Sequence, residues 1–191
     1  MKEKLLMVIF LLVLGSILTT ALVAVNYYTK PTIEKNEELK LKRNILRALK
    51  LDFQEEEIEE VFEENVTVKE KGGRTFFIAR TEKVAFLFEG SGLWGPIRGA
   101  IAMDTALTTI DGITIIYQEE TPGLGSRIAE REYLDKFIGK KFSPELELTG
   151  EGKAVEENEI DAITGATLSS DALIRILNNN YREYNEAFKG E

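Results

Sequence analysis

The segment Leu5–Val25 reads LLMVIFLLVLGSILTTALVAV and holds no charged residue over 21 positions. At about 1.5 Å rise per residue, a helix of this length spans the roughly 30 Å hydrocarbon core of a bilayer. A cleaved signal peptide also starts with a short basic region, but its apolar part is usually about 7–15 residues long, and no A-x-A cleavage site follows here. A buried core helix is a third alternative that matches this length less well. We expect a retained transmembrane helix.

The charges nearest this segment predict its orientation. Lys2 and Lys4 precede it and only Lys30 closely follows it, although four basic residues between positions 35 and 43 reverse the count. Long domains cross the membrane largely regardless of charge, so the nearest flank is the better guide. The interpretation is a cytoplasmic start at residues 1–4, a transmembrane helix at 5–25 and an extracytoplasmic remainder at the cell inner membrane.

The composition excludes several kinds of chemistry. The chain has no Cys and no His, so disulfides, thiolate-held clusters, a serine–histidine triad and a three-histidine zinc site are all excluded. Beyond residue 25 there are 22 basic and 32 acidic residues, a net charge of −10. Such a domain gains no attraction from anionic lipid, and the charge argues against binding nucleic acid. Redox work would require an organic cofactor.

Residue patterning beyond the membrane segment predicts an α+β fold, an antiparallel sheet flanked by helices. We expect Pro31 to interrupt the exit from the membrane, 26–65 to form a helical connector and 66–191 to form the main domain. Gly72-Gly73 and Asp111-Gly112 are expected hairpin turns. The glutamates of residues 55–64 predict a solvated helix face rather than a metal site. The predicted helices cover 32–52, 58–62, 127–138 and 168–188, and the predicted strands cover 66–69, 75–80, 84–88, 100–110 and 113–117.

One loop of interest, Glu120–Ser126, reads ETPGLGS and lies between a predicted strand and a predicted helix. It is typical of a strand-to-helix turn in which Gly123 and Gly125 accept unusual dihedral angles and Ser126 caps the helix. Its glycines would also let a flat ligand approach the backbone closely. The residues alone favour the turn.

A second loop, Asp161–Ser170, reads DAITGATLSS and directly precedes the last predicted helix. Its hydroxyl side chains are ordinary helix-capping residues. Gly165 and Ala166 also leave room beside several hydroxyls at a helix N-terminus, where free N–H groups and the helix dipole favour a phosphate. A P-loop is excluded because the Gly-Lys-Thr/Ser ending is missing.

Three segments in the same order carry a resemblance: W-G-P-I-R-G from Trp94, E-T-P-G-L-G from Glu120 and D-A-I-T-G-A-T-L-S-S from Asp161. Across about residues 85–185 the chain resembles the FMN-binding subunits of the Rnf electron-transport complex and of the related sodium-pumping NADH:quinone reductase. It is more similar to the G subunit of the Rnf complex than to the longer C subunit of the reductase. The resemblance implies FMN bound covalently to Thr167 through a phosphoester. The further cofactor-binding residues that we predict are Thr164, Gly165, Ala166, Leu168, Ser169, Ser170, Glu120, Thr121, Gly123, Leu124, Gly125 and Trp94.

The implied function is that of an electron-transfer subunit of a membrane-bound, ion-translocating ferredoxin:NAD oxidoreductase, with no turnover alone, no catalytic residue and no metal. Multi-span membrane subunits are the expected partners, because one helix without internal charge makes a poor ion path. A flavin transferase is also expected, since a Thr hydroxyl needs a base and the chain has no His; Asp161 belongs to the implied recognition motif, or is simply a polar loop residue. The alternatives are a subunit of the sodium-pumping reductase, a membrane-tethered flavin-binding protein or sensor outside such a complex, and an anchored assembly subunit whose Thr-rich loop only caps a helix.

Overall fold

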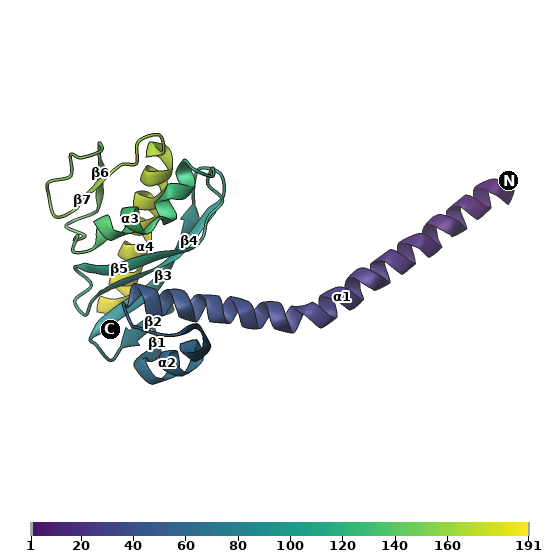
Figure 1. The fold of residues 1–191 in the computed structure, drawn as a ribbon, viewed down its shortest axis with the longest axis horizontal. Coiled ribbons are helices and arrows are strands. Elements are labelled where there is room, and N and C mark those ends of the chain that lie inside the picture. Colours follow the sequence, from purple (N-terminus) through teal and green to yellow (C-terminus); the bar gives the residue numbers. More distant parts are fainter. Residues whose placement is uncertain (1, 191) are drawn as a thin grey trace. The chain divides into compact units, whose positions relative to one another are not determined.

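The computed structural model describes residues 2–190, which fall into two compact units divided between Leu39 and Lys40. The first unit is helical, and its helix α1 (Lys2–Ala48) continues into the second unit (Figure 1). Among the described residues, α1 is the one helix that is long and apolar enough to span a membrane, with a window of mean hydropathy 2.7. The expected break at Pro31 is wrong, because α1 runs through it. A proline removes one helical hydrogen bond, and the helix-forming residues that follow keep theirs.

The second unit is built on an antiparallel sheet of five strands in the order β1-β2-β3-β4-β5 (Figure 1). The strands are β1 (Val66–Lys71), β2 (Arg74–Ala79), β3 (Lys83–Ser91), β4 (Pro96–Asp104) and β5 (Ile110–Tyr117). Gly72 and Gly73 have φ angles of 57° and 72°, as a two-residue hairpin turn requires, so the first predicted turn is confirmed. This antiparallel sheet with its helices confirms the predicted α+β fold.

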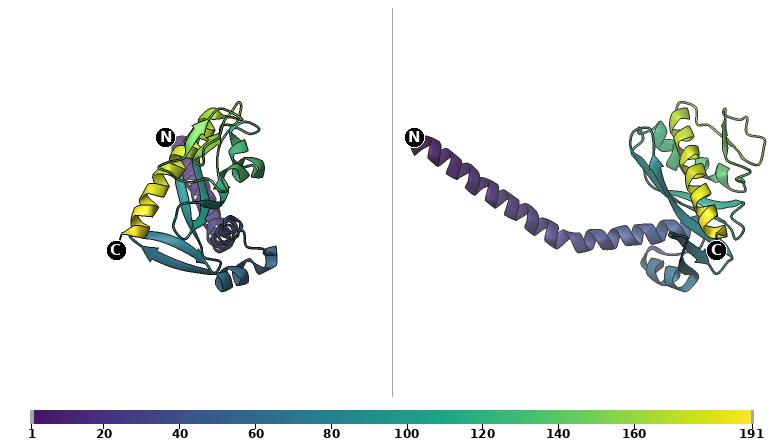
Figure 2. Two further views of the ribbon diagram at one scale, coloured as in Figure 1. Left: turned by 90° about the vertical axis from the view of Figure 1, so that its left-hand side faces the viewer. Right: turned by 180° about the vertical axis from the view of Figure 1, so that it is seen from behind.

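The long helix α4 (Thr167–Lys189) packs on one face of the sheet, and Figure 2 displays it crossing the strands. The ring of Phe86 on β3 stacks on that of Tyr184 on α4, with centroids 4.3 Å apart. Nearer the start of α4, Gly90 lets Ile176 approach, since a Cβ at Gly90 would lie 2.6 Å from Ile176 Cγ1. This core fixes the N-terminal end of α4 close to the β3–β4 connection.

The end of α1 lies against β5, and this contact explains why the second predicted turn is wrong. Gly112 lies within β5 and pairs with Ala102, whereas the connection between β4 and β5 runs through residues 105–109. A Cβ at Gly112 would lie 2.2 Å from the Ala48 carbonyl oxygen. The Thr114 hydroxyl also donates to the Asn44 carbonyl at 3.2 Å. Gly112 is therefore a close-packing position rather than a turn.

The remaining elements are short. The predicted helix over 127–138 is broken, because Glu130 has extended dihedral angles of −72° and 139°. A small parallel pair, β6 and β7, leads into the loop before α4. The short elements of this unit are η1 (Glu55–Glu57), α2 (Ile58–Asn65), η2 (Gly125–Ala129), α3 (Arg131–Leu134), η3 (Asp135–Phe137), β6 (Glu147–Thr149) and β7 (Glu159–Asp161). The compact unit beginning at Lys40 thus includes the larger part of the segment expected as a connector, namely residues 40–65.

Candidate functional site

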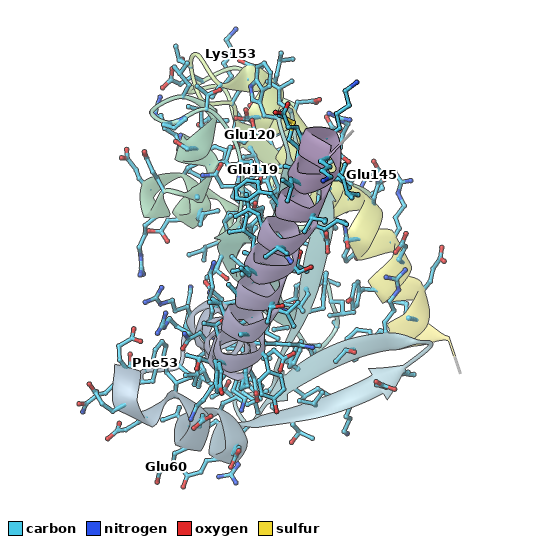
Figure 3. All side chains as sticks on the ribbon, turned by 90° about the vertical axis from the view of Figure 1, so that its right-hand side faces the viewer. Phe53, Glu60, Glu119, Glu120, Glu145 and Lys153 are labelled. Carbon is cyan, nitrogen blue, oxygen red and sulfur yellow. The ribbon has the colours of Figure 1, made fainter. Side chains whose placement is uncertain are left out.

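Glu120 joins the three segments singled out in the sequence. The residue is 3 % exposed, and its Oε1 accepts hydrogen bonds from the backbone N–H groups of Leu93 at 2.7 Å and Trp94 at 3.3 Å. The Ser169 hydroxyl, on the first turn of α4, donates to Oε2 at 2.6 Å. Figure 3 labels Glu120 beside Glu119, well away from Glu60 on α2. The three sequence segments therefore meet at one buried carboxylate.

Glycines around this carboxylate have two different roles. A Cβ at Gly92 would lie 2.4 Å from Glu120 Oε1, and a Cβ at Gly125 would lie 2.4 Å from the Ser169 hydroxyl oxygen, so both are packing positions. Gly123 and Gly165 instead have φ angles of 73° and 81°. A Cβ at Gly123 would meet nothing within 4 Å, and one at Gly165 would meet only Leu124, at 3.8 Å. Of these four glycines, only Gly123 and Gly165 leave open space for a ligand.

The start of α4 carries no side-chain cap. Its N-cap residue is Ala166, which makes no side-chain capping hydrogen bond, and Thr167 is the first helical residue and is exposed. The Ser170 hydroxyl is buried, donates to the Ala166 carbonyl at 3.1 Å and accepts from the Ile163 N–H at 3.2 Å. The N–H groups of a first turn have no partner within the helix, so this end suits an anion. The expectation that the loop hydroxyls cap the helix is wrong.

The turn before α4 is held by charged neighbours. The Thr164 hydroxyl donates to the Glu151 carboxylate, and an Arg127 guanidinium N–H donates to the Thr164 carbonyl at 3.4 Å. Asp161 accepts from the N–H groups of Lys153 and Ala154, each at 2.9 Å. The Ala154 N–H is the largest cause that lowers the pKa of Asp161, and the Lys153 N–H adds to it against a smaller opposing effect of burial. Asp161 thus fixes the 150–155 loop beside the turn that precedes α4.

Exposed apolar side chains come from the same three segments. Leu93 is 48 % exposed and Trp94 71 %, both on the β3–β4 loop, Leu124 on the β5–η2 loop is 51 % exposed, and Leu168 on α4 is 65 % exposed. Glu120 links the Leu93–Trp94 loop to the first turn of α4, and Leu124 is the side chain nearest to Gly165, so these exposed residues are carried by adjacent segments. Exposed apolar residues on adjacent segments are typical of a binding surface. We call these four residues the apolar face. Flat aromatic rings bury well on such side chains, and Thr167, the hydroxyl residue next to Leu168, is exposed beside them.

The predicted site residues take distinct places in this arrangement. Thr121, Gly123, Leu124, Thr164, Gly165, Thr167, Leu168 and Trp94 are exposed, whereas Glu120, Gly125, Ala166, Ser169 and Ser170 are buried. Ser126 does not cap a helix as expected: its hydroxyl oxygen accepts from the Gly123 N–H at 3.0 Å. Sequence reasoning missed Leu93, and its apolar character beside Trp94 was the available signal. It also missed Gln118, whose side-chain oxygen accepts the Glu120 N–H at 2.6 Å.

Comparison with known proteins agrees with this geometry. Residues 92–182 match the family model described as the FMN-binding domain. Those residues span all three segments of the site. A flavin mononucleotide would bring a flat ring and a phosphate, and the side chains present fit both: the apolar face suits the ring, and the uncapped start of α4 suits the phosphate.

Relatives that are named as the C subunit of a Na(+)-translocating NADH-quinone reductase match about half of the chain. The protein from Haemophilus ducreyi is 33 % identical over 115 residues, 56 % of this chain and 45 % of that protein. The protein from Neisseria meningitidis serogroup A is 41 % identical over 91 residues, 42 % of this chain and 33 % of that protein. The chain thus spans less than half the length of these curated relatives.

Solved structures extend the likeness to most of the chain. The crystal structure of the C subunit of the same reductase from Parabacteroides distasonis aligns with a TM-score of 0.74 and 25 % identity, covering 85 % of this chain and 98 % of that one. The structure of NqrC from Shewanella oneidensis aligns with a TM-score of 0.69 at 19 % identity, which concerns the fold alone. Residues 92–182 are therefore similar to an FMN-binding domain, and the chain is similar to the C subunit of that reductase over the residues that align.

Proposed function

We propose that this chain is an electron-transfer subunit that carries FMN in phosphoester linkage to Thr167. The observation that carries the proposal is the position of Thr167, which is exposed at the uncapped start of α4 beside the apolar face. Bound there, FMN would supply the redox chemistry, and the chain would bind and orient it. The first-turn N–H groups would hold the phosphate, and Leu93, Trp94, Leu124 and Leu168 would shield the ring from water.

The attachment is a phosphoryl transfer without change of oxidation state. The bond from the Thr167 hydroxyl oxygen to phosphorus forms, the hydroxyl proton leaves, and the phosphoanhydride bond of an activated flavin donor breaks as its other phosphate fragment departs. The chain contains no His that could accept the proton, and Glu120 and Ser169 are hydrogen-bonded to each other. We therefore propose that a separate flavin transferase supplies the base.

The complex we propose is an Rnf-type ferredoxin:NAD oxidoreductase that moves ions, with multi-span membrane partners. The resemblance of the three motifs to the Rnf G subunit supports it. The alternative, a sodium-pumping NADH:quinone reductase, is favoured by a specific observation, namely that the named relatives are its C subunit. Helix α1 would anchor the chain in the inner membrane, with residues 1–4 cytoplasmic and the FMN domain outside. A membrane-tethered flavoprotein or sensor outside a complex would purify without multi-span partners.

Mass spectrometry of the full chain, produced with and without a flavin transferase, tests the attachment. We expect the transferase to add the mass of one FMN less one water to the peptide that contains Thr167. Thr167→Val should abolish flavin colour that survives denaturation, Thr167→Ser should restore it, and Thr67→Val on the exposed face of β1 is the matched control. An unmodified wild-type Thr167 in cells that contain the transferase would refute the proposal. Copurified subunits that accept electrons from ferredoxin or pass them to quinone would distinguish the two complexes.

A further inference from the structure

Glu120 is the only charged residue among residues 2–190 that is buried. Burying a carboxylate is strongly unfavourable unless hydrogen bonds compensate for the lost water. Here both oxygens are engaged, Oε1 by the two amides of the Leu93–Trp94 loop and Oε2 by Ser169. Glu120 is therefore in an unsuitable position for direct contact with a ligand ring, although the sequence motif includes it among the binding residues.

The two oxygens of Glu120 connect different parts of the site. Oε1 binds the loop that carries half of the apolar face, and Oε2 binds the helix turn that carries Thr167 and Leu168. Gly92 and Gly125 fit closely around this carboxylate, so it has little freedom to move. The partly positive N-terminus of α4 also favours a negative charge at this place. If the carboxylate is removed, the hydrogen bonds that connect the Leu93–Trp94 loop to α4 through residue 120 are lost.

We propose that Glu120 is a positioning residue that holds the Leu93–Trp94 loop against the first turn of α4, so that the apolar face is assembled around Thr167 before FMN is attached. This inference rests on the proposed function and assigns Glu120 a role in it other than ligand contact. It predicts that the effect of Glu120 is present in the flavin-free protein and is transmitted through Leu93 and Trp94.

The test uses the full chain in detergent micelles, first without flavin. Hydrogen exchange of the Leu93 amide and the fluorescence of Trp94, the single Trp of the chain, report the loop. In Glu120→Ala we expect Leu93 to exchange about tenfold faster or more, because an N–H bonded to a charged group loses its acceptor. Trp94 emission should become more accessible to a soluble quencher. Glu120→Gln, which keeps an oxygen for Leu93 and an amide for Ser169, should restore most of both signals.

A further variant and a control complete the flavin-free test. The variant breaks the hydrogen bond of Glu120 to α4 and leaves its hydrogen bonds to the Leu93–Trp94 loop. Ser169→Ala removes only the contact to α4, so the Leu93 amide should stay protected while the Ser170 amide, which donates to the Ala166 carbonyl at 3.0 Å, exchanges faster. Glu63→Gln is the control, because Glu63 is an exposed glutamate on α2, outside the three segments of the site. Circular dichroism confirms that each variant is folded; if Glu120→Ala fails to fold, Ser169→Ala and Glu120→Gln carry the test.

The second stage adds the transferase and flavin. Glu120→Ala should acquire FMN several-fold more slowly than wild type, and the attached flavin should be more accessible to a soluble quencher, with Glu120→Gln again restoring both. Unchanged Leu93 exchange and Trp94 quenching in a folded Glu120→Ala chain would overturn the inference. The inference would also be overturned if the Leu93 amide of Glu120→Ala exchanged faster while the rate of FMN attachment and the accessibility of the flavin stayed as in wild type. Absence of FMN on the wild-type chain would instead count against the proposed function, since the flavin-free measurements do not depend on it.

Discussion

The substitution Gly125→Ala tests the packing at the centre of the site. The added Cβ would lie 2.4 Å from the Ser169 hydroxyl oxygen and 2.9 Å from the Glu120 Cβ, and both neighbours are 3 % exposed. Contacts of this kind are normally about 3.5 Å, so one neighbour must shift by about 1 Å. Neither is the free end of a flexible surface chain. The shift must therefore strain the loop or separate the Ser169–Glu120 pair.

The loss of stability in Gly125→Ala has two causes, the overpacking around the new Cβ and the weakened hydrogen bond between Ser169 and Glu120. Overpacking costs about 1–3 kcal/mol, and partial loss of the hydrogen bond from Ser169 to the charged carboxylate adds to it, since such a bond contributes about 1.5–3 kcal/mol. We expect Gly125→Ala to lower the free energy of unfolding by about 2–4 kcal/mol. For a domain of this size each kcal/mol corresponds to about 2–4 °C, so the melting temperature should fall by about 4–16 °C.

Thermal unfolding of the flavin-free full chain, followed by circular dichroism, is the assay. Gly150→Ala is the control, because a Cβ there would meet only the flexible end of Lys153, at 3.3 Å, and we expect a change within about 0.5 kcal/mol. Gly123→Ala should be intermediate, since its φ of 73° costs a side chain about 1–2 kcal/mol although the space is open. If Gly125→Ala is no more destabilising than Gly123→Ala, the close packing around Glu120 is refuted.

Three other predictions concern the support of the site. Gly112→Ala should destabilise the fold by about 3 kcal/mol in urea unfolding, because its Cβ would meet the backbone oxygen of Ala48 at 2.2 Å; a loss below about 1 kcal/mol would contradict that contact. Tyr133→Phe should stabilise by about 1 kcal/mol, because the buried hydroxyl has no hydrogen-bond partner among the described residues. Burial raises the pKa of Tyr133 from 10.0 to about 12, so the stability that depends on its proton is present below pH 10 and is lost as pH rises towards about 12. In thermal melts, Tyr133→Phe should therefore lose less stability at alkaline pH than the wild type. An alkaline loss equal to that of the wild type would contradict this prediction. Asp161→Asn should lower the stability of the fold at neutral pH and remove part of the stability loss seen below about pH 4. The reason is that a carboxyl whose pKa is lowered in the fold stabilises it above the unfolded value of 3.8 and ceases to do so as pH falls. Melting temperatures between pH 2 and pH 7 that parallel those of the wild type would contradict this prediction.

The two sequence pairs typical of hairpin turns illustrate which parts of the fold the sequence can predict. Gly72-Gly73 is a real hairpin turn because the strands on both sides are adjacent along the chain, and local residue preference decides the outcome. Asp111-Gly112 has the same local signal but lies within β5, since Gly112 receives the end of α1 at Ala48. That contact joins residues more than sixty positions apart, so no local pattern contains it.

The glycines of the two site loops also differ in whether local sequence or a long-range contact determines their role. Gly123, Gly125 and Gly165 look alike in sequence, and the ETPGLG loop as a whole predicts close approach by a flat ligand. Only Gly123 and Gly165 combine open space with a positive φ, whereas the space beside Gly125 is filled by Ser169 and Glu120. The three-dimensional meeting of the segments decides between these roles, because Ser169 beside Gly125 and Leu124 beside Gly165 each come from another segment.

For the hydroxyls at the start of α4, in contrast, the sequence contained a usable signal. Residues four apart share a helix face, so Ser169 lies with Leu173 and Ser170 with Ile174, and all four are buried. Leu168 lies with the exposed polar side of the helix at Arg175. Helical spacing alone would therefore assign Ser169 and Ser170 to the interior and leave Thr167, at the helix start, as the hydroxyl accessible to a reagent. The packing of its neighbours, rather than its own chemistry, is what distinguishes Thr167 from Ser169 and Ser170 in this structure.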